Sequence, residues 1–153
     1  WFPVVGYNYR MTNIAAALGL AQLEQIDGFV EKRLEIAAHY HRLLEGLQDF
    51  IELPSELPWA RHTWWSYVIV LRDTVRMERD EFMRRLESDG IETRPVFYPM
   101  HILPPYLEPD GHYPVAERIS SRGMSLPMHG LLNDDDVSYI AERLGHWSKY
   151  AGV

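Results

Sequence analysis

A helical apolar pattern near the start of the chain constrains the fold more than any other feature. After Thr12, a suitable N-cap, residues 13–25 are rich in Ala, Leu and Gln. A break near Asp27 and Gly28 separates this predicted helix from a longer one over residues 29–47. Each apolar stripe needs a surface to pack against, so we expect both helices to join a core or an interface. The stripe positions are Ile14, Ala17, Leu18 and Ala21 in the first helix, and Ile36, Ala37, Tyr40, Leu43, Leu44 and Leu47 in the second.

Short strand and helix patterns alternate through the rest of the chain. Between them, residues 98–113 hold Pro99, Pro104, Pro105, Pro109 and Gly111, which favours a stiff loop. The predicted fold class is α/β in the α+β sense, with a small, mostly antiparallel sheet and flanking helices. The remaining expected elements are strands over 64–71, 91–97 and 124–126, and helices over 78–88, 114–122 and from Asn133 onward.

Composition excludes several classes of function. The chain has 153 residues and a formal net charge of -7, which argues against an electrostatic grip on nucleic acid or an anionic membrane. It has no cysteine, so a disulfide framework, a thiolate nucleophile and Cys-ligated zinc are excluded, and a reducing compartment fits. There is no apolar run long enough to cross a membrane and no signal-peptide pattern. Because the first residue is Trp1 rather than Met, we expect a piece of a longer protein.

Familiar catalytic and metal-binding patterns are missing from the sequence. His39 and His41 point to different helix faces and cannot share a metal ion as an i, i+4 pair would. The three aspartates at 134–136 are explained by the positive end of a helix dipole, so no metal site is predicted. A phosphate-binding glycine loop and a serine nucleophile elbow are also absent. Only Lys32 and Lys149 are available for lysine chemistry.

Two segments are richer in hydrogen-bonding side chains than connectors require. In residues 6–11, an Asn and an Arg near a helix start could hold a phosphate or carboxylate, or the segment is a surface turn with aromatic anchors. In residues 93–101, an Arg, a Tyr and a His lie on a loop stiffened by prolines. They could line a ligand-binding site, or the aromatic residues of the loop could pack against the core. Trp59, Trp64 and Trp65 could stack a sugar or base, although strand aromatics usually belong to a core.

These segments resemble signature blocks of one enzyme family. GYNYRMTNIAAALGLAQL at residues 6–23 is similar to the segment that opens the C-terminal part of the DegT/DnrJ/EryC1/StrS sugar aminotransferases, fold type I enzymes that use pyridoxal phosphate (PLP). GIETRP at 90–95, YPMH at 98–101 and LPPY at 103–106 resemble the next block, most closely that of the GDP-perosamine synthases. In this family the Schiff-base lysine lies upstream of the first block, and neither lysine here can replace it.

The resemblance implies roles for individual residues. Asn8 matches the position that reaches across a dimer interface to the PLP phosphate of the neighbouring subunit. Arg10 is a candidate for binding the amino donor's carboxylate or for fixing its loop, and Arg94, Tyr98 and His101 would line the mouth where the substrate enters. Because the Schiff-base lysine is absent, no catalytic residue is expected in this chain, and we expect the chain alone to be inactive.

The resemblance also implies an organisation and a reaction. Residues 1–48 would be a lead-in and two helices linking a large to a small domain, and residues 49–153 would be the small C-terminal domain. The enzyme would be cytoplasmic and would need an N-terminal large domain and a homodimer partner. It would move an amino group from glutamate to a keto carbon of a nucleotide-linked deoxysugar, and the product would be used for polysaccharides such as O-antigen. One such conversion is GDP-4-keto-6-deoxymannose to GDP-perosamine. The alternative is a non-catalytic module for nucleotide-sugar binding or dimerisation.

Overall fold

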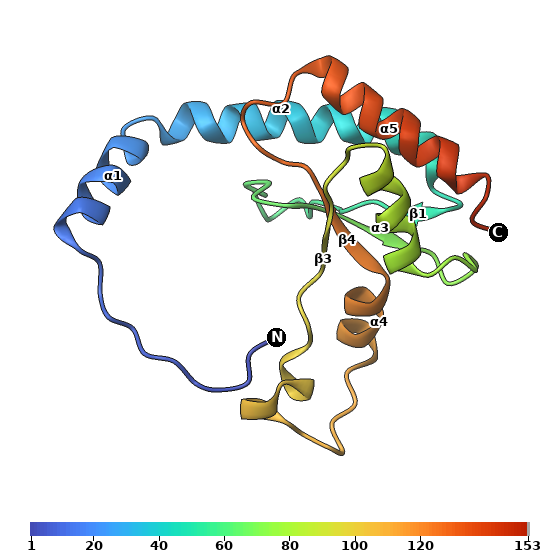
Figure 1. Ribbon diagram of the computed structural model, residues 1–153. Helices are drawn as coiled ribbons and strands as arrows, with labels where there is room; N and C mark the ends of the chain where they lie inside the picture. The colour runs from blue at the N-terminus through green and yellow to red at the C-terminus, as the bar shows by residue number, and fades with distance from the viewer. Residues whose placement is uncertain (153) are drawn as a thin grey trace.

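The computed structural model describes residues 1–152 and shows a compact body with a long N-terminal arm (Figure 1). Five α-helices and a four-stranded sheet make up the regular structure of that part of the chain. The helices are α1 (Asn13–Leu23), α2 (Ile26–Leu44), α3 (Arg79–Ser88), α4 (Pro114–Arg122) and α5 (Asp134–Ser148). The strands are β1 (Ile51–Glu52), β2 (Tyr67–Leu71), β3 (Arg94–Pro95) and β4 (Gly123–Leu126), and the short 3-10 turns are η1 (Glu45–Leu47), η2 (Met100–Ile102) and η3 (Pro104–Tyr106).

The sheet has the strand order β1-β2-β4-β3, and every neighbouring pair is antiparallel. The α/β class with a small antiparallel sheet and flanking helices is therefore confirmed. Alternation along the strands gives the sheet two different faces. One face is fully buried under α2, α3 and α5 and carries Tyr67, Ile69, Leu71, Met124 and Leu126.

The second face of the sheet is only partly covered. Gly123 lies there beneath α4, and a Cβ at this position would meet the backbone oxygen of Ile119 and come within 2.7 Å of the Val96 side chain. Glycine is therefore required where α4 passes directly into β4. Farther along, Val68, Ser125 and Arg94 sit side by side across three strands, and this part of the face borders an open groove.

Helix α2 is held to the sheet by buried aromatic residues with polar ends. The rings of Tyr40 and Tyr67 are fully buried with centroids 4.9 Å apart. The Tyr40 hydroxyl donates to the Pro127 carbonyl (3.0 Å), and the Tyr67 hydroxyl donates to His41 Nδ1 (3.0 Å). His41 Nε2 lies 2.8 Å from the Pro54 carbonyl and donates to it. Burial raises the pKa of both tyrosines, so their hydroxyls stay protonated and act as donors.

Most predicted elements appear with shifted ends. Thr12 caps α1 through Ala15 N, and Asn133 caps α5 in a reciprocal capping box with Asp136. Gly90 follows the C-cap residue of α3 and has φ +80°, a conformation that favours glycine and ends the helix. The long helix begins at Ile26 rather than at 29, and its last residues, 45–47, form a 3-10 turn.

Two strand predictions need correction, and one strand was not predicted. The expected strand 64–71 starts only at Tyr67, because Trp64 has the left-handed φ of +50° that breaks extended backbone. The expected extended piece 91–97 pairs over only two residues, Arg94–Pro95, since Pro95 lacks the N–H needed to continue a ladder. Strand β1 was not predicted, because a two-residue strand has no detectable alternation.

The arm formed by residues 1–12 and α1 does not reach the core. No residue of α1 is buried, and its exposed apolar residues, among them Ile14, Leu18, Leu20 and Leu23, lie around the helix rather than in the single stripe that was predicted. The accessible surface of the chain is 10857 Å². A compact monomer of 17.9 kDa would expose roughly 8,000 Å². The extended arm with its uncovered apolar residues accounts for such an excess. Among the described helices, none is both long and apolar enough to span a membrane.

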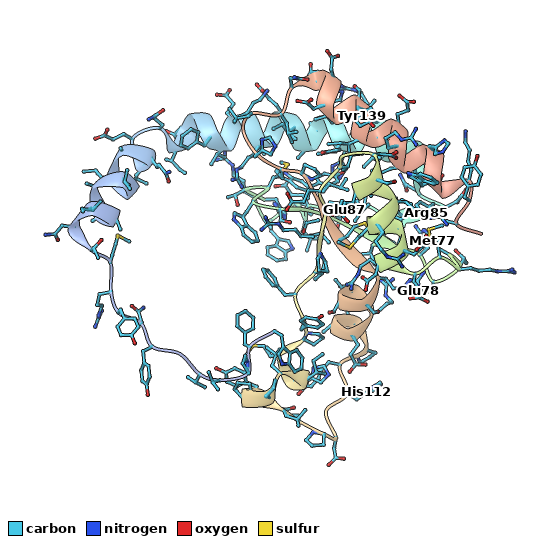
Figure 2. All side chains as sticks on the ribbon, in the orientation of Figure 1. Met77, Glu78, Arg85, Glu87, His112 and Tyr139 are labelled. Atoms are coloured by element: carbon cyan, nitrogen blue, oxygen red, sulfur yellow. The ribbon has the colours of Figure 1, made fainter. Side chains whose placement is uncertain are left out.

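Asp89 joins the end of α3 to α5. Its Oδ2 accepts from Arg143 Nε and from Trp147 Nε1, both at 2.7 Å, and its carbonyl accepts from the Tyr139 hydroxyl at 3.0 Å. Figure 2 shows Arg85 on α3 close to this end of α5, and its guanidinium lies 5.1 Å from the centre of the Trp147 ring. The hydrogen bond from Arg143, followed by that from Trp147, lowers the pKa of Asp89.

We predict that Asp89→Asn makes the chain less stable at neutral pH but not at acid pH. A carboxylate whose pKa is lowered by folding stabilises the fold above its unfolded pKa of about 3.9, and this contribution disappears as pH falls through the folded value. Urea unfolding of the wild type and the variant between pH 2 and pH 7 should therefore show a difference that shrinks on acidification. Glu87→Gln, in the last turn of α3 and with no ion pair among the described residues, is the control. A difference that does not change with pH would contradict this role of Asp89.

Candidate functional site

The uncovered part of the second sheet face forms the floor of an open groove of about 1320 Å³. Val68 of β2, Ser125 of β4 and Arg94 of β3 lie on this floor, and the Ser66 hydroxyl donates to Ser125 Oγ at 2.8 Å. The walls come from the loop before β2, the segments on both sides of β3 and the loop after β4, and residues 1–2, Arg33 of α2 and the first turns of α5 also line the groove. A concave surface with polar groups on a rigid sheet is typical of a small-molecule site.

The groove combines exposed aromatic rings with cations. The aromatic residues are Trp1, Phe2, Trp65, Phe97, Tyr98 and Tyr139, and the cations are Arg33 and Arg94. Arg94 pairs with Glu92 at 3.2 Å, but both side chains are about 80% exposed, so the pair contributes little to stability. The Arg94 guanidinium can therefore exchange this partner for an anionic ligand at low cost.

The loop before β2 sends two adjacent tryptophans in opposite directions. Trp64 is buried in the core and stacks on His62, whereas Trp65 is 68% exposed and lines the groove. Arg33 Nη1 on α2 donates to the Trp65 carbonyl at 3.1 Å and lies 3.5 Å from the Trp64 carbonyl. His62 Nδ1 accepts from Trp64 N at 2.7 Å, and Glu56 accepts from His62 N at 2.6 Å.

Asn8 and Arg10 lie together on the arm, away from the groove. The Asn8 side-chain oxygen accepts from Arg10 N at 2.8 Å, and Arg10 has φ +71°, so the two residues form a tight local turn. Both are exposed, and neither lines the groove of this chain. The Asn8 amide nitrogen is left pointing away from that bond and can donate to another group. Their predicted roles in cofactor and donor binding remain predictions.

The other three predicted residues divide between the groove and its support. Arg94 and Tyr98 line the groove, where the Tyr98 ring meets Trp1 edge-on with centroids 5.7 Å apart. The side chain of His101 is only 10% exposed and faces Glu117 at 3.1 Å, with the Tyr113 ring beside it. His101 therefore does not line the groove in this structure; it anchors the loop that carries Tyr98.

Glu117 at the start of α4 is the main anchor of that loop. Its carboxylate accepts from Tyr113 N at 3.0 Å and lies 3.1 Å from His101 Nε2 and 4.0 Å from His112 Nδ1. The hydrogen bond from Tyr113 N is the largest cause of the lowered pKa of Glu117, and the two histidines add to it. Figure 2 shows the labelled His112 at the far end of this loop.

Neither lysine contributes to the groove. Lys32 Nζ pairs with Glu35 at 3.5 Å, one turn along α2, and Lys149 follows the end of α5. Residues 1–152 also contain no group of three or more side chains able to hold a metal ion. The described lining of the groove therefore holds no lysine side chain for a covalent bond to a carbonyl compound.

Comparison with known proteins identifies the family. The model of the DegT/DnrJ/EryC1/StrS aminotransferase family matches residues 1–145. The chain belongs to this family. It is 42% identical over 147 residues to a GDP-perosamine synthase of Escherichia coli O157:H7, a match that covers 96% of the chain and 39% of that relative. A GDP-perosamine synthase of Caulobacter vibrioides is 39% identical over 145 residues, which cover 94% of the chain and 39% of the relative.

The fold agrees with family structures. DesV of S. venezuelae, solved in complex with a ketimine intermediate, superimposes with a TM-score of 0.82 at 27% identity. That match covers 95% of the chain and 39% of the DesV chain. The chain thus spans about two-fifths of the length of the family members that it matches.

Sequence reasoning missed part of the groove. Arg33 looked like one of several solvated charges on α2, because only the folded loop brings backbone carbonyls within its reach. Ser66 and Ser125 carry no motif, and the register of β2 against β4 is what pairs them. Trp65 was named only within a group of three tryptophans, and the alternation of the chain did not reveal the left-handed turn that separates it from Trp64.

We predict that Glu117→Ala loosens the loop without unfolding the domain. Loss of the bond to Tyr113 N and of the histidine contacts should raise amide exchange across residues 99–113 by about tenfold, because these contacts hold the end of the loop to α4. Hydrogen exchange followed by mass spectrometry measures this directly. Asp110→Ala, an exposed acidic residue of the same loop, is the control. Unchanged exchange in the Glu117 variant would show that the prolines alone hold the loop.

Proposed function

We propose that this chain is the C-terminal part of a PLP-dependent aminotransferase. The proposed reaction moves an amino group from glutamate to a keto carbon of a nucleotide-linked deoxysugar, as in the conversion of GDP-4-keto-6-deoxymannose to GDP-perosamine. The observation that carries this proposal is the family match over residues 1–145, together with about 40% identity to two GDP-perosamine synthases. A cytoplasmic role in supplying amino sugars for polysaccharides such as O-antigen follows from the same assignment.

The groove supports a nucleotide-linked substrate. Arg33 and Arg94 supply cations for a diphosphate, and the surrounding aromatic rings supply flat apolar faces for a base and a sugar. Glu92 and Asp136 line the same groove, so the two arginines would bind an anionic substrate by direct contact rather than through a net positive charge of the groove. Under this proposal Arg94 and Tyr98 contact the substrate, while His101 positions the loop that carries Tyr98.

The residues of this chain do not complete a PLP site. A PLP enzyme of this family needs a lysine at the cofactor, and both lysines here lie away from the groove. No chemical step is therefore assigned to this chain. Asn8 is the residue proposed to reach the PLP phosphate, and because it does not line its own groove, we propose that it serves the site of a second subunit.

We further propose that the arm packs against a large domain and a second copy of the protein. The support is the uncovered apolar surface of α1 and an accessible surface of 10857 Å², well above the roughly 8,000 Å² expected for a compact chain of this size. In this arrangement residues 1–48 link the two domains and residues 49–153 form the small domain. The core nevertheless extends into α2, since Ile36, Ala37, Tyr40 and Leu44 are buried with the sheet.

A second candidate is a non-catalytic module that binds nucleotide sugars or mediates dimerisation. The observation that favours it is the absence of either lysine from the groove. The gene separates the two candidates, since an in-frame coding region with a lysine before Trp1 supports the aminotransferase and a start codon next to Trp1 supports the module.

We predict that the complete reading frame aminates a GDP-linked 4-keto-6-deoxysugar with glutamate, whereas the 153-residue chain alone does not. Product formation followed by mass spectrometry tests the first part. For the second, PLP and borohydride are added to the isolated chain, and peptide mapping is expected to find no adduct confined to one lysine. A stable adduct on Lys32 or Lys149 alone would contradict the assignment of the catalytic lysine to a part of the protein outside this chain.

We predict that Asn8→Ala in the complete protein weakens PLP binding by about tenfold, the cost of one charge-assisted hydrogen bond to a phosphate. PLP affinity is measured by titration of the apoprotein, with absorbance as the readout. Asn13→Ala changes a neighbouring amide at the start of α1 and is the matched control. Equal PLP affinity in the Asn8 variant and the wild type would remove Asn8 from the cofactor site.

A further inference from the structure

We propose that Trp65 is the stacking surface for the nucleobase of the substrate and that Arg33 is the residue that positions it. This inference rests on the proposed function, because a nucleotide-linked substrate is what it requires. Trp65 lines the groove with 68% of its surface exposed, although a large aromatic side chain next to a core strand would ordinarily be buried. Its neighbour Trp64 takes the buried place instead.

The backbone that separates the two tryptophans is unfavourable by itself. Trp64 has φ +50°, a region that bulky L-residues avoid and that persists only where surrounding contacts impose it. Here His62 accepts from Trp64 N at 2.7 Å and stacks on its ring with centroids 4.1 Å apart. Strained conformations of this kind gather at binding sites, which points to a use for the side chain that the turn exposes.

Arg33 ties this turn to α2. Its Nη1 donates to the Trp65 carbonyl at 3.1 Å, and Arg33 itself lines the groove. The guanidinium therefore fixes the backbone at Trp65 and also places a positive charge in the same groove. A flat indole face next to cations matches a nucleoside diphosphate, with the base on the indole and the diphosphate near Arg33 and Arg94.

Two other exposed aromatic residues, Trp59 and Tyr98, fit this role less well, and the remaining aromatic residues of the groove have no hydrogen bond to their backbone from a side chain of another element among the described residues. Trp59 belongs to the same loop and is 82% exposed, but it does not line the groove. Tyr98 lines the groove, yet its ring already meets Trp1 edge-on. Trp65 is thus an exposed tryptophan in the groove whose backbone is held by a side chain from another element.

The test compares GDP with inorganic pyrophosphate, which lacks the base. Dissociation constants are measured by calorimetry on the complete protein. Trp65→Leu should weaken GDP binding by about tenfold, because one base–aromatic stack is lost, and it should leave pyrophosphate binding unchanged. Trp65→Phe keeps an aromatic face and should stay within about threefold of the wild type for GDP. Trp59→Leu is the matched control and should change neither.

Arg33 is tested by the ratio of the two dissociation constants. Arg33→Met should weaken the binding of both ligands, and it should shift the ratio of the GDP to the pyrophosphate dissociation constant toward the value found for Trp65→Leu. The double variant should show no further shift of this ratio, because both changes remove the same stack. Arg33→Lys should restore part of the ratio. If Arg33→Met weakens the binding of GDP and of pyrophosphate by the same factor, Arg33 contributes only its charge and its positioning role is overturned.

The outcomes separate this inference from the proposed function. If the complete protein aminates the sugar but Trp65→Leu binds GDP like the wild type, the stacking role is wrong and the enzyme assignment stands. If GDP binding depends on Trp65 but no amination occurs, stacking stands and the assignment fails. Equal weakening of GDP and pyrophosphate in Trp65→Leu, or no GDP binding to the wild type, overturns the inference.

Discussion

The packing of α2 on the sheet through Tyr40, His41 and Tyr67 is the interaction on which the rest of the structure depends. The two tyrosine rings lie in the core, where the Tyr40 hydroxyl bonds to a loop carbonyl and the Tyr67 hydroxyl bonds to His41 on α2. Tyr40 holds the loop after β4 at Pro127, and His41 holds the loop before β2 at Pro54. These are the loops that wall the groove, so the same contacts that close the core also set the shape of the site.

The groove exists because the sheet is covered unequally. One face is sealed by α2, α3 and α5, and α4 covers only the part of the other face near Gly123. The remaining strand positions, Val68, Ser125 and Arg94, are left as a rigid floor. Side chains on strands are held more firmly than side chains on loops, and this suits a surface that has to orient a ligand.

Sequence reasoning recovered what depends on local periodicity and capping. The five helices, the stops at Gly90 and Gly123 and the caps at Thr12 and Asn133 all follow from side chains within one turn of the feature they control. What it missed depends on contacts between distant segments. The left-handed turn at Trp64 needs Arg33 from another element, and the inward orientation of His101 needs Glu117, sixteen positions along the chain. Neither contact leaves a pattern in a single sequence.

The direct junction of α4 and β4 at Gly123 has a mechanical consequence. With no intervening loop and no room for a side chain, the helix and the strand form one stiff unit. Glu117 ties the loop that carries Tyr98 to one end of this unit, and Ser125 sits on the groove floor at the other end. The loop that carries Tyr98 and the part of the groove floor at Ser125 are therefore both attached to one helix–strand unit, so their relative position depends on that unit.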